Sequence, residues 1–202
     1  MKNVILYIHG KGGSADESRH YIPLFPDHDV TGLDYRAFTP WAAGEEIHTA
    51  VEELKSRYDN IILIANSIGA FFCMNADIDR LIQKAYFISP VVDMEKLIYD
   101  MMTWANVTEE ELENKGVIPT NFGEELSWEY LCYVRRCPVS WDCPTDILYG
   151  SRDDLTSFDT IKAFAAKNNA DLTVMEKGEH WFHTEEQMSF LDEWIRRREK
   201  NI

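Results

Sequence analysis

One stretch decides the fold of this chain: residues 60–70, which read NIILIANSIGA. The first half of this stretch is a continuous apolar run rich in β-branched residues, which is typical of a strand buried on both faces of a parallel sheet. The second half places a small residue two positions before Ser67, Ala65, and another two positions after it, Gly69, as a tight turn requires. The stretch therefore predicts a buried strand that turns sharply into a helix at Ser67.

Five further apolar runs have a similar character and alternate with helical patterns. The six predicted strands are residues 4–8, 29–33, 60–65, 84–89, 145–149 and 171–175. Between the second and third strands, Ile47, Val51 and Leu54 follow the spacing of one helical face. This alternation predicts an α/β fold with a mostly parallel six-stranded sheet flanked by helices. A length of 202 residues suits a single domain that spans residues 1–202.

Residues 93–143 interrupt the alternation of strands and helices. The segment shows no clear strand pattern, and it is too long for a simple connection between two strands. It carries 11 acidic, 4 basic and 7 aromatic residues. We therefore predict a helical lid insertion, at about residues 93–143, that lies over the sheet.

The turn at Ser67 carries the first chemical signal. Residues 65–69 match G-x-S-x-G, a strand-to-helix turn that exposes a nucleophilic serine, with Ala65 in place of the first glycine. Ser67 would project at the carboxyl edge of the sheet, where α/β folds place their ligands. The backbone N–H of Ile68 would lie at a helix N-terminus and could donate to an oxyanion. A serine that merely caps a helix is the alternative interpretation.

The first predicted strand ends in the sequence His9-Gly10-Lys11. Together with the turn at Ser67, this HG dipeptide resembles the α/β-hydrolase family. The resemblance covers residues 4 to about 85 and 145 to about 195, but not residues 93–143. It implies a minimal α/β-hydrolase fold in which the N–H of Lys11 and the N–H of Ile68 form the oxyanion hole. The sequence departs from the family pattern at Ala65 and lacks the family's opening strands.

Two later strand ends carry the other groups that a serine hydrolase needs. The resemblance implies that His180, in the turn after the last strand, is the general base. It implies that Asp153, after the fifth strand, is the acid that orients the imidazole, with Asp154 and Asp93 as alternatives. The serine, the acid and the histidine then follow one another along the chain in the order that is typical of the family.

These residues together predict a serine hydrolase of the carboxylesterase type, which would cleave an ester, thioester or amide bond of a small molecule through an acyl-enzyme. No metal or organic cofactor is implied. The Trp and Tyr residues of the segment 93–143 favour an apolar or aromatic acyl group. The net charge of this segment, 4 basic minus 11 acidic residues or −7, disfavours an anionic substrate.

Two other functions fit parts of the sequence. Residues 10–15 also match G-x-G-x-x-A, and Asp34 follows at about the spacing of a ribose-binding acid, which would indicate a dinucleotide site. However, Pro23 and Pro26 leave no long amphipathic helix to face a pyrophosphate. The second alternative is a hydrolase-fold protein that binds a ligand or partner without turnover, although no triad residue is missing.

Charge and hydropathy limit the remaining classes. The chain carries 20 basic and 35 acidic residues, a net charge of −15, which disfavours nucleic acids and anionic membranes as partners. No apolar run is long enough to span a bilayer, and the first apolar run lacks a signal-peptide cleavage site, so we expect a cytoplasmic protein. The four cysteines match no zinc-binding spacing. The sequence gives no prediction of the oligomeric state.

Overall fold

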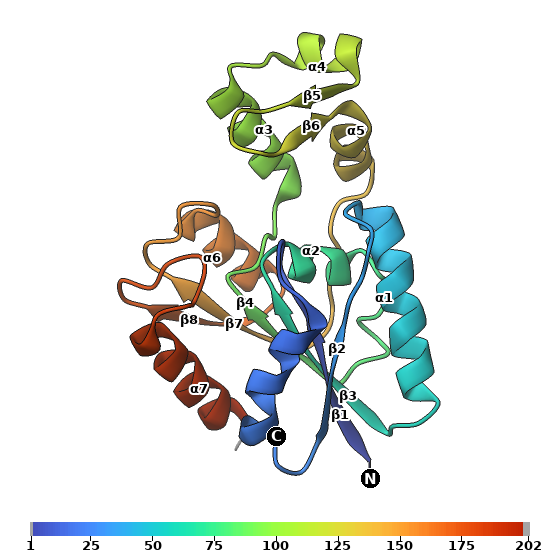
Figure 1. Ribbon diagram of the computed structural model, residues 1–202, viewed down its shortest axis with the longest axis vertical. Coiled ribbons are helices and arrows are strands. Elements are labelled where there is room, and N and C mark those ends of the chain that lie inside the picture. Colours follow the sequence, from blue (N-terminus) through green and yellow to red (C-terminus); the bar gives the residue numbers. More distant parts are fainter. Residues whose placement is uncertain (1, 200–202) are drawn as a thin grey trace. The chain divides into compact units, whose positions relative to one another are not determined.

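The computed structural model describes residues 2–199, and its central element is a parallel sheet of six strands (Figure 1). The strands are β1 (Asn3–Ile8), β2 (Asp29–Leu33), β3 (Asn60–Asn66), β4 (Lys84–Ile88), β7 (Thr145–Gly150) and β8 (Asp171–Met175). Their order is β2-β1-β3-β4-β7-β8, and every neighbouring pair is parallel. The prediction of six strands is confirmed, and each predicted boundary is correct to within one residue.

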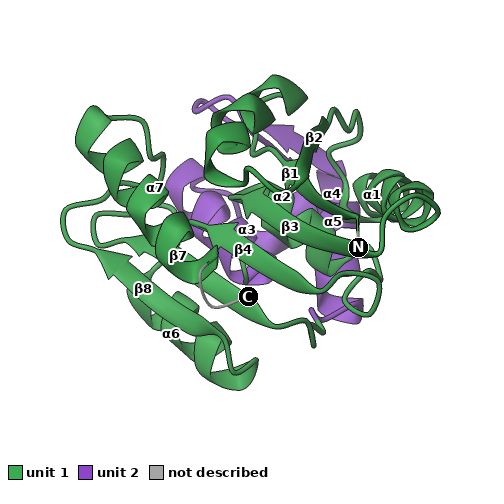
Figure 2. Ribbon diagram, turned by 90° about the horizontal axis from the view of Figure 1, so that it is seen from below, with its two compact units in different colours: residues 1–92, 140–202 green, residues 93–139 purple. Residues whose placement is uncertain are grey.

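Helices cover both faces of the sheet. They are the 3-10 helix η1 (Ala15–Leu24) and the α-helices α1 (Pro40–Lys55), α2 (Ile68–Met74), α6 (Phe158–Lys167) and α7 (Glu185–Glu199). Figure 2 shows α6 and α7 on opposite faces of the sheet. On one face, Tyr21 of η1 and Trp194 of α7 are buried in a core that includes Tyr7, Ile62 and Tyr86 of the strands. The central strands are thus buried on both faces, which is why they consist of continuous apolar runs.

All six strands run in the same direction, so their carboxyl ends lie at one edge of the sheet. The loops after β1, β3, β7 and β8 therefore emerge at this shared edge. The candidate residues Lys11, Ser67, Asp153 and His180 all lie in these loops or at their ends. The parallel topology alone thus gathers side chains that are far apart in the sequence.

Residues Asp93–Val139 form a separate compact unit (Figure 2). This unit contains α3 (Met94–Ala105), α4 (Glu109–Lys115), β5 (Val117–Pro119), β6 (Glu125–Ser127) and α5 (Trp128–Arg136). The two short strands pair in antiparallel fashion, and across their turn Thr120 Oγ1 donates to the carbonyl of Glu124 at 2.7 Å. The insertion is therefore not purely helical. Strands of three residues each are too short to show an alternating pattern in the sequence.

The last residues of the segment 93–143 are packed with the sheet unit. The ring of Trp141 lies 5.4 Å from that of Phe87 in β4, and its Nε1 donates to Thr145 Oγ1 at 2.8 Å. Cys143 is buried beside the start of β7. The compact unit accordingly ends at Val139, four residues before the boundary that the sequence suggested. No helix within residues 2–199 has both the length and the apolar character that crossing a bilayer requires.

Candidate active site

Ser67 lies in the sharp turn between β3 and α2. Its backbone has φ 49° and ψ −121°, a conformation that a residue with a side chain rarely adopts. The turn is held by β4 and the segment after it, because the N–H of Ser67 donates to Ile88 O at 3.0 Å and the N–H of Val91 donates to Ser67 O at 3.1 Å. The strain at Ser67 is therefore supported by backbone hydrogen bonds on both sides of the residue.

The turn at Ser67 packs directly against the end of β1. A Cβ atom on Gly69 would lie 2.3 Å from the carbonyl oxygen of His9, so only glycine fits at this position. The closest atoms belong to β1 and its loop, the segment that contains Lys11.

The structure brings Ser67, His180 and Asp153 together. Ser67 Oγ lies 2.8 Å from His180 Nε2, and His180 Nδ1 lies 2.7 Å from Asp153 Oδ2. The side chain of Asp153 is fully buried, and that of His180 is 18% exposed. Because an ionised carboxylate can only accept, Nδ1 of His180 carries the proton that it shares with Asp153. Nε2 is then free to accept the proton of the Ser67 hydroxyl.

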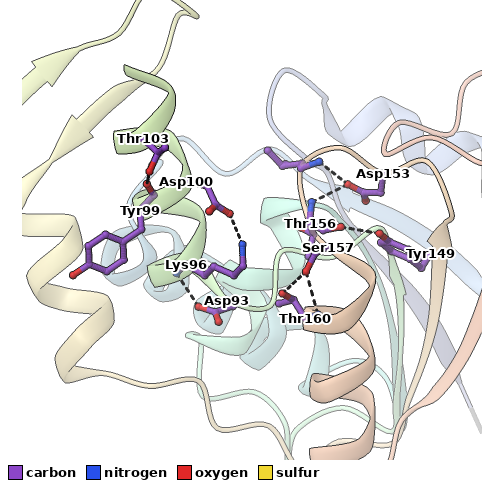
Figure 3. Close-up of polar contacts among 11 residues, drawn as sticks. Asp93, Lys96, Tyr99, Asp100, Thr103, Tyr149, Asp153, Thr156, Ser157 and Thr160 are labelled. Carbon is purple, nitrogen blue, oxygen red and sulfur yellow. Dashed lines mark hydrogen bonds and ion pairs between the residues drawn. The ribbon is translucent and has the colours of Figure 1, made fainter. Parts of the chain in front are cut away.

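The second carboxylate oxygen of Asp153 is also satisfied. Asp153 Oδ1 accepts from the N–H of Leu155 and from the N–H of Thr156, each at 2.9 Å (Figure 3). Of the two alternative acids, Asp154 is exposed, and Asp93 caps α3 by accepting from the N–H of Lys96 at 2.9 Å. Asp153 is therefore the carboxylate that contacts the imidazole.

Two glycines bring the loop of Asp153 and the loop of His180 into contact. A Cβ atom on Gly150 would lie 2.5 Å from both the carbonyl carbon and the carbonyl oxygen of Gly178. The N–H of Arg152 donates to the same carbonyl of Gly178 at 2.8 Å. The carboxyl ends of β7 and β8 are thereby joined through their backbones, which sets the distance between acid and imidazole.

The loop after β1 is fixed by His9, which the sequence marked only as part of the HG dipeptide. His9 Nδ1 lies 2.7 Å from the carbonyl oxygen of Gly10, and the N–H of Gly13 donates to the same oxygen at 3.2 Å. A carbonyl can only accept, so Nδ1 of His9 is the donor. The Gly10 carbonyl and the Lys11 N–H belong to one planar peptide, so holding the carbonyl also fixes the direction of the N–H.

Tyr35 in turn holds His9. The two rings are stacked, with their centroids 4.3 Å apart, and the Tyr35 hydroxyl donates to the carbonyl of His9 at 2.9 Å. The HG dipeptide marked the position of His9 in the sequence, but no local signal could indicate that Tyr35 folds back onto it.

Ile68, the other expected donor, is the first residue of α2, where a helical N–H has no partner within the helix.

The features that suggested a dinucleotide site have other roles in the structure. Asp34 Oδ1 accepts from the N–H of Ala15 at 2.6 Å, so this carboxylate anchors the loop after β1. From Ala15 onwards the chain forms the 3-10 helix η1, which contains Pro23, and not a long α-helix. Within residues 2–199 no group of three or more His, Cys, Asp or Glu side chains could hold a metal ion.

Comparisons with known proteins agree with this architecture. No family model matches the chain. A Mycoplasma genitalium protein provisionally named esterase/lipase 3 is 30% identical over 119 residues, which cover 54% of this chain and 43% of that protein. The match thus spans less than half of the length of this curated relative.

The solved structures that resemble the chain are α/β-hydrolases. Est1E from Butyrivibrio proteoclasticus has a TM-score of 0.79 and 16% identity, covering 99% of this chain and 88% of that one. Mouse α/β-hydrolase domain-containing protein 10 has a TM-score of 0.72 and 14% identity, and the match covers 98% of this chain and 90% of that one. The thioesterase domain from the curacin biosynthetic pathway has a TM-score of 0.62 and 15% identity, and the match covers 96% of this chain and 91% of that one. The chain therefore has the α/β-hydrolase fold, as the sequence predicted.

Proposed function

We propose that this chain is a serine hydrolase that cleaves an ester, thioester or amide bond of a small molecule through an acyl-enzyme at Ser67. The observation that carries the proposal is the continuous series of contacts from Ser67 Oγ to His180 Nε2, at 2.8 Å, and from His180 Nδ1 to Asp153 Oδ2, at 2.7 Å. A nucleophile, a base and an orienting acid in this arrangement can activate a hydroxyl at neutral pH.

In the acylation step, Ser67 Oγ attacks the acyl carbon while His180 Nε2 removes the hydroxyl proton. The Asp153 carboxylate stabilises the imidazolium that forms. The carbonyl oxygen of the substrate becomes an oxyanion, which accepts from the N–H of Lys11 and the N–H of Ile68. When the tetrahedral intermediate collapses, the bond to the leaving group breaks, and His180 gives its proton to that group.

Deacylation repeats the same proton transfers with water as the nucleophile. His180 Nε2 takes a proton from the water as its oxygen attacks the acyl carbon of the ester on Ser67. The second tetrahedral intermediate then releases Ser67, which regains its proton from His180. The products are a carboxylic acid and the free enzyme, and water is the only co-reactant that the balance of the reaction needs.

Ester hydrolysis is the first activity to test. The curated relative is named as an esterase/lipase, and a structural neighbour from Pyrococcus furiosus is named as an esterase. A second neighbour is a thioesterase domain, and thioester cleavage would use the same groups. The net charge of −15 argues against polyanionic substrates.

The compact unit of residues 93–139 is proposed as a lid that selects the acyl group. Its surface carries Trp104 and Phe122, which are 52% and 40% exposed and pack edge to face with ring centroids 6.1 Å apart. An exposed aromatic pair offers apolar contact area to an acyl chain. Acidic residues on the same unit disfavour anionic chains.

Turnover of a substrate panel tests the proposed function. The panel contains p-nitrophenyl esters with acyl chains of increasing length, the matching thioesters and the matching anilides, hydrolysed by wild type and by Ser67→Ala. We expect wild type to hydrolyse at least the esters, and Ser67→Ala to fall to background. Equal rates for both proteins would refute the role of Ser67. A folded wild type without any turnover would favour a protein that binds its ligand without reaction.

A further inference from the structure

Three polar side chains form a hydrogen-bonded series beside the turn at Ser67. Asn66, the residue before Ser67, donates from Nδ2 to the hydroxyl oxygen of Tyr7 at 2.9 Å. The Tyr7 hydroxyl donates in turn to Oε2 of Glu17. Asn66 ends β3, Tyr7 lies in β1 and Glu17 lies in η1, so the series joins three separate elements. The mechanism proposed above uses none of these three side chains.

The carboxylate of Glu17 determines which group donates and which accepts in each hydrogen bond of the series. An ionised carboxylate only accepts, so the Tyr7 hydroxyl must donate to Glu17, and its oxygen must accept from Asn66. Burial raises the pKa of Tyr7 far above its ordinary value, and the phenol therefore keeps the proton that it donates. Among the described residues, Asn66 Oδ1 is buried without a hydrogen-bond partner. The orientation of the Asn66 amide therefore depends on Tyr7.

One end of the series packs against the segment that carries Lys11, and the other end belongs to the segment that carries Ile68. At one end, a Cβ atom on Gly13 would lie 2.7 Å from Oε1 and 3.0 Å from Oε2 of Glu17, so the carboxylate packs against the loop that contains Lys11. At the other end, Asn66 is joined through Ser67 to Ile68. The series thus connects the segment that carries one N–H donor with the segment that carries the other.

We propose that Glu17, Tyr7 and Asn66 are positioning residues that hold the N–H groups of Lys11 and Ile68 at the spacing that the oxyanion requires. This inference rests on the proposed serine hydrolase function. The three side chains act through the backbone and do not touch the reacting atoms. Donors fixed in advance stabilise the transition state strongly, and a small displacement of a donor lowers the rate without weakening the binding of substrate.

The test compares Tyr7→Phe, Glu17→Ala and Glu17→Gln with wild type. Each protein is assayed for kcat and KM on a p-nitrophenyl ester, and for the inhibition constant of a trifluoromethyl ketone, which forms a tetrahedral oxyanion adduct on serine. Tyr7→Phe and Glu17→Ala should lower kcat by about 10-fold, leave KM within about 2-fold and weaken the inhibitor by the same factor as kcat. Glu17→Gln keeps an acceptor for the Tyr7 hydroxyl and should remain close to wild type.

A matched control is Tyr58→Phe, which removes another hydrogen bond from tyrosine to carboxylate. Tyr58 donates to Asp29 Oδ2 at 2.8 Å, and Asp29 begins β2 at the opposite edge of the sheet from Ser67. This variant should retain wild-type kcat and inhibitor affinity. Thermal unfolding of every variant verifies that the proteins compared are folded at the assay temperature.

The outcomes separate this inference from the proposed function. A wild type that neither hydrolyses esters nor binds the ketone overturns both. An active wild type with a Tyr7→Phe variant of equal kcat and equal inhibitor affinity overturns only the positioning role. A fall in kcat with unchanged inhibitor affinity, or an equal loss in Glu17→Gln and Glu17→Ala, also overturns it, because neither result follows from misplaced N–H donors.

Discussion

Gly150 and Gly178 are in direct backbone contact, so close that a Cβ atom on Gly150 would lie 2.5 Å from the carbonyl carbon of Gly178. This contact joins the ends of β7 and β8, the two strands that carry Asp153 and His180 in the loops that follow them. The distance between Asp153 and His180 therefore depends on two residues without side chains.

Substitution of Gly150 by alanine should impair the site more than it impairs the fold. The added methyl group must push the loop of residues 176–180 away, which lengthens the contact from His180 to Asp153. Overpacking of this kind costs about 1–3 kcal/mol of unfolding free energy. We expect kcat to fall by about 10-fold or more in protein that is still folded, measured by ester hydrolysis alongside thermal unfolding.

The control for this variant is Gly44→Ala in α1. A Cβ atom on Gly44 would lie 2.8 Å from the carbonyl oxygen of Asn75, a comparable backbone clash at the far end of α2 from Ser67. This variant should lose stability to a similar extent and keep its kcat. If Gly150→Ala retains wild-type kcat, the contact between the two glycines does not set the geometry of the acid and the base.

Asparagine substitutions distinguish the three candidate acids. Asp153→Asn replaces the carboxylate that accepts from His180 Nδ1 with an amide that can present a donor, and this favours the wrong imidazole tautomer. We expect kcat to fall by about 10⁴-fold, the order seen when a triad aspartate becomes asparagine. Asp154→Asn and Asp93→Asn are matched controls that should keep kcat within about 2-fold. Asp154 is exposed, and at position 93 asparagine is also a good helix cap. A large loss in either control would contradict the assignment.

Truncation of the aromatic pair on the unit of residues 93–139 tests whether this unit selects the acyl group. The double variant Trp104→Ala with Phe122→Ala should lower kcat/KM for an octanoyl ester by about 10-fold and leave an acetyl ester within about 2-fold. Both side chains are exposed, so the unfolding free energy should change by less than about 1 kcal/mol. Val117→Ala, an exposed aliphatic residue of the same unit, is the control. Unchanged chain-length preference would argue against a lid.

The four cysteines should differ in reactivity. Burial raises the pKa of the Cys143 thiol to about 12, and burial also raises the pKa of Cys73. A raised pKa keeps a thiol protonated and unreactive at neutral pH, and reactivity increases only as the pH rises toward that pKa. At pH 8 we expect a disulfide reagent to titrate Cys137 rapidly and Cys132 more slowly, because Cys137 is exposed and Cys132 partly so. Rapid titration of all four thiols in folded protein would contradict the burial of Cys73 and Cys143.

The sequence predicted the sheet well because buried parallel strands leave a direct signal in the chain. A strand such as β3 is covered on both faces and must be apolar throughout, which an unbroken run of aliphatic residues reveals. The strands β5 and β6 gave no such signal, because each has three residues and, of their six side chains, only that of Leu126 is buried. Local pattern therefore identified the long buried elements and missed the short exposed ones.

The site was predictable in part for a similar reason. Each of the residues Ser67, Asp153 and His180 follows a recognisable strand, and the resemblance to a family supplied their roles as expectations. Asp153 and not Asp154 contacts the imidazole because of the fold of its loop, in which Asp153 Oδ1 accepts from the N–H groups of Leu155 and Thr156. The stacking of Tyr35 on His9 likewise joins loops that only the folded sheet brings together.

The most direct test of the account is whether Ser67 is an activated nucleophile. Wild type, Ser67→Ala and His180→Ala are treated with a fluorophosphonate probe, and the adduct is measured by intact mass and then located by peptide mapping. The account predicts one adduct per wild-type chain, attached at Ser67, no adduct on Ser67→Ala and strongly slowed labelling of His180→Ala. A folded wild type that remains unlabelled, or that is labelled at another residue, would contradict it.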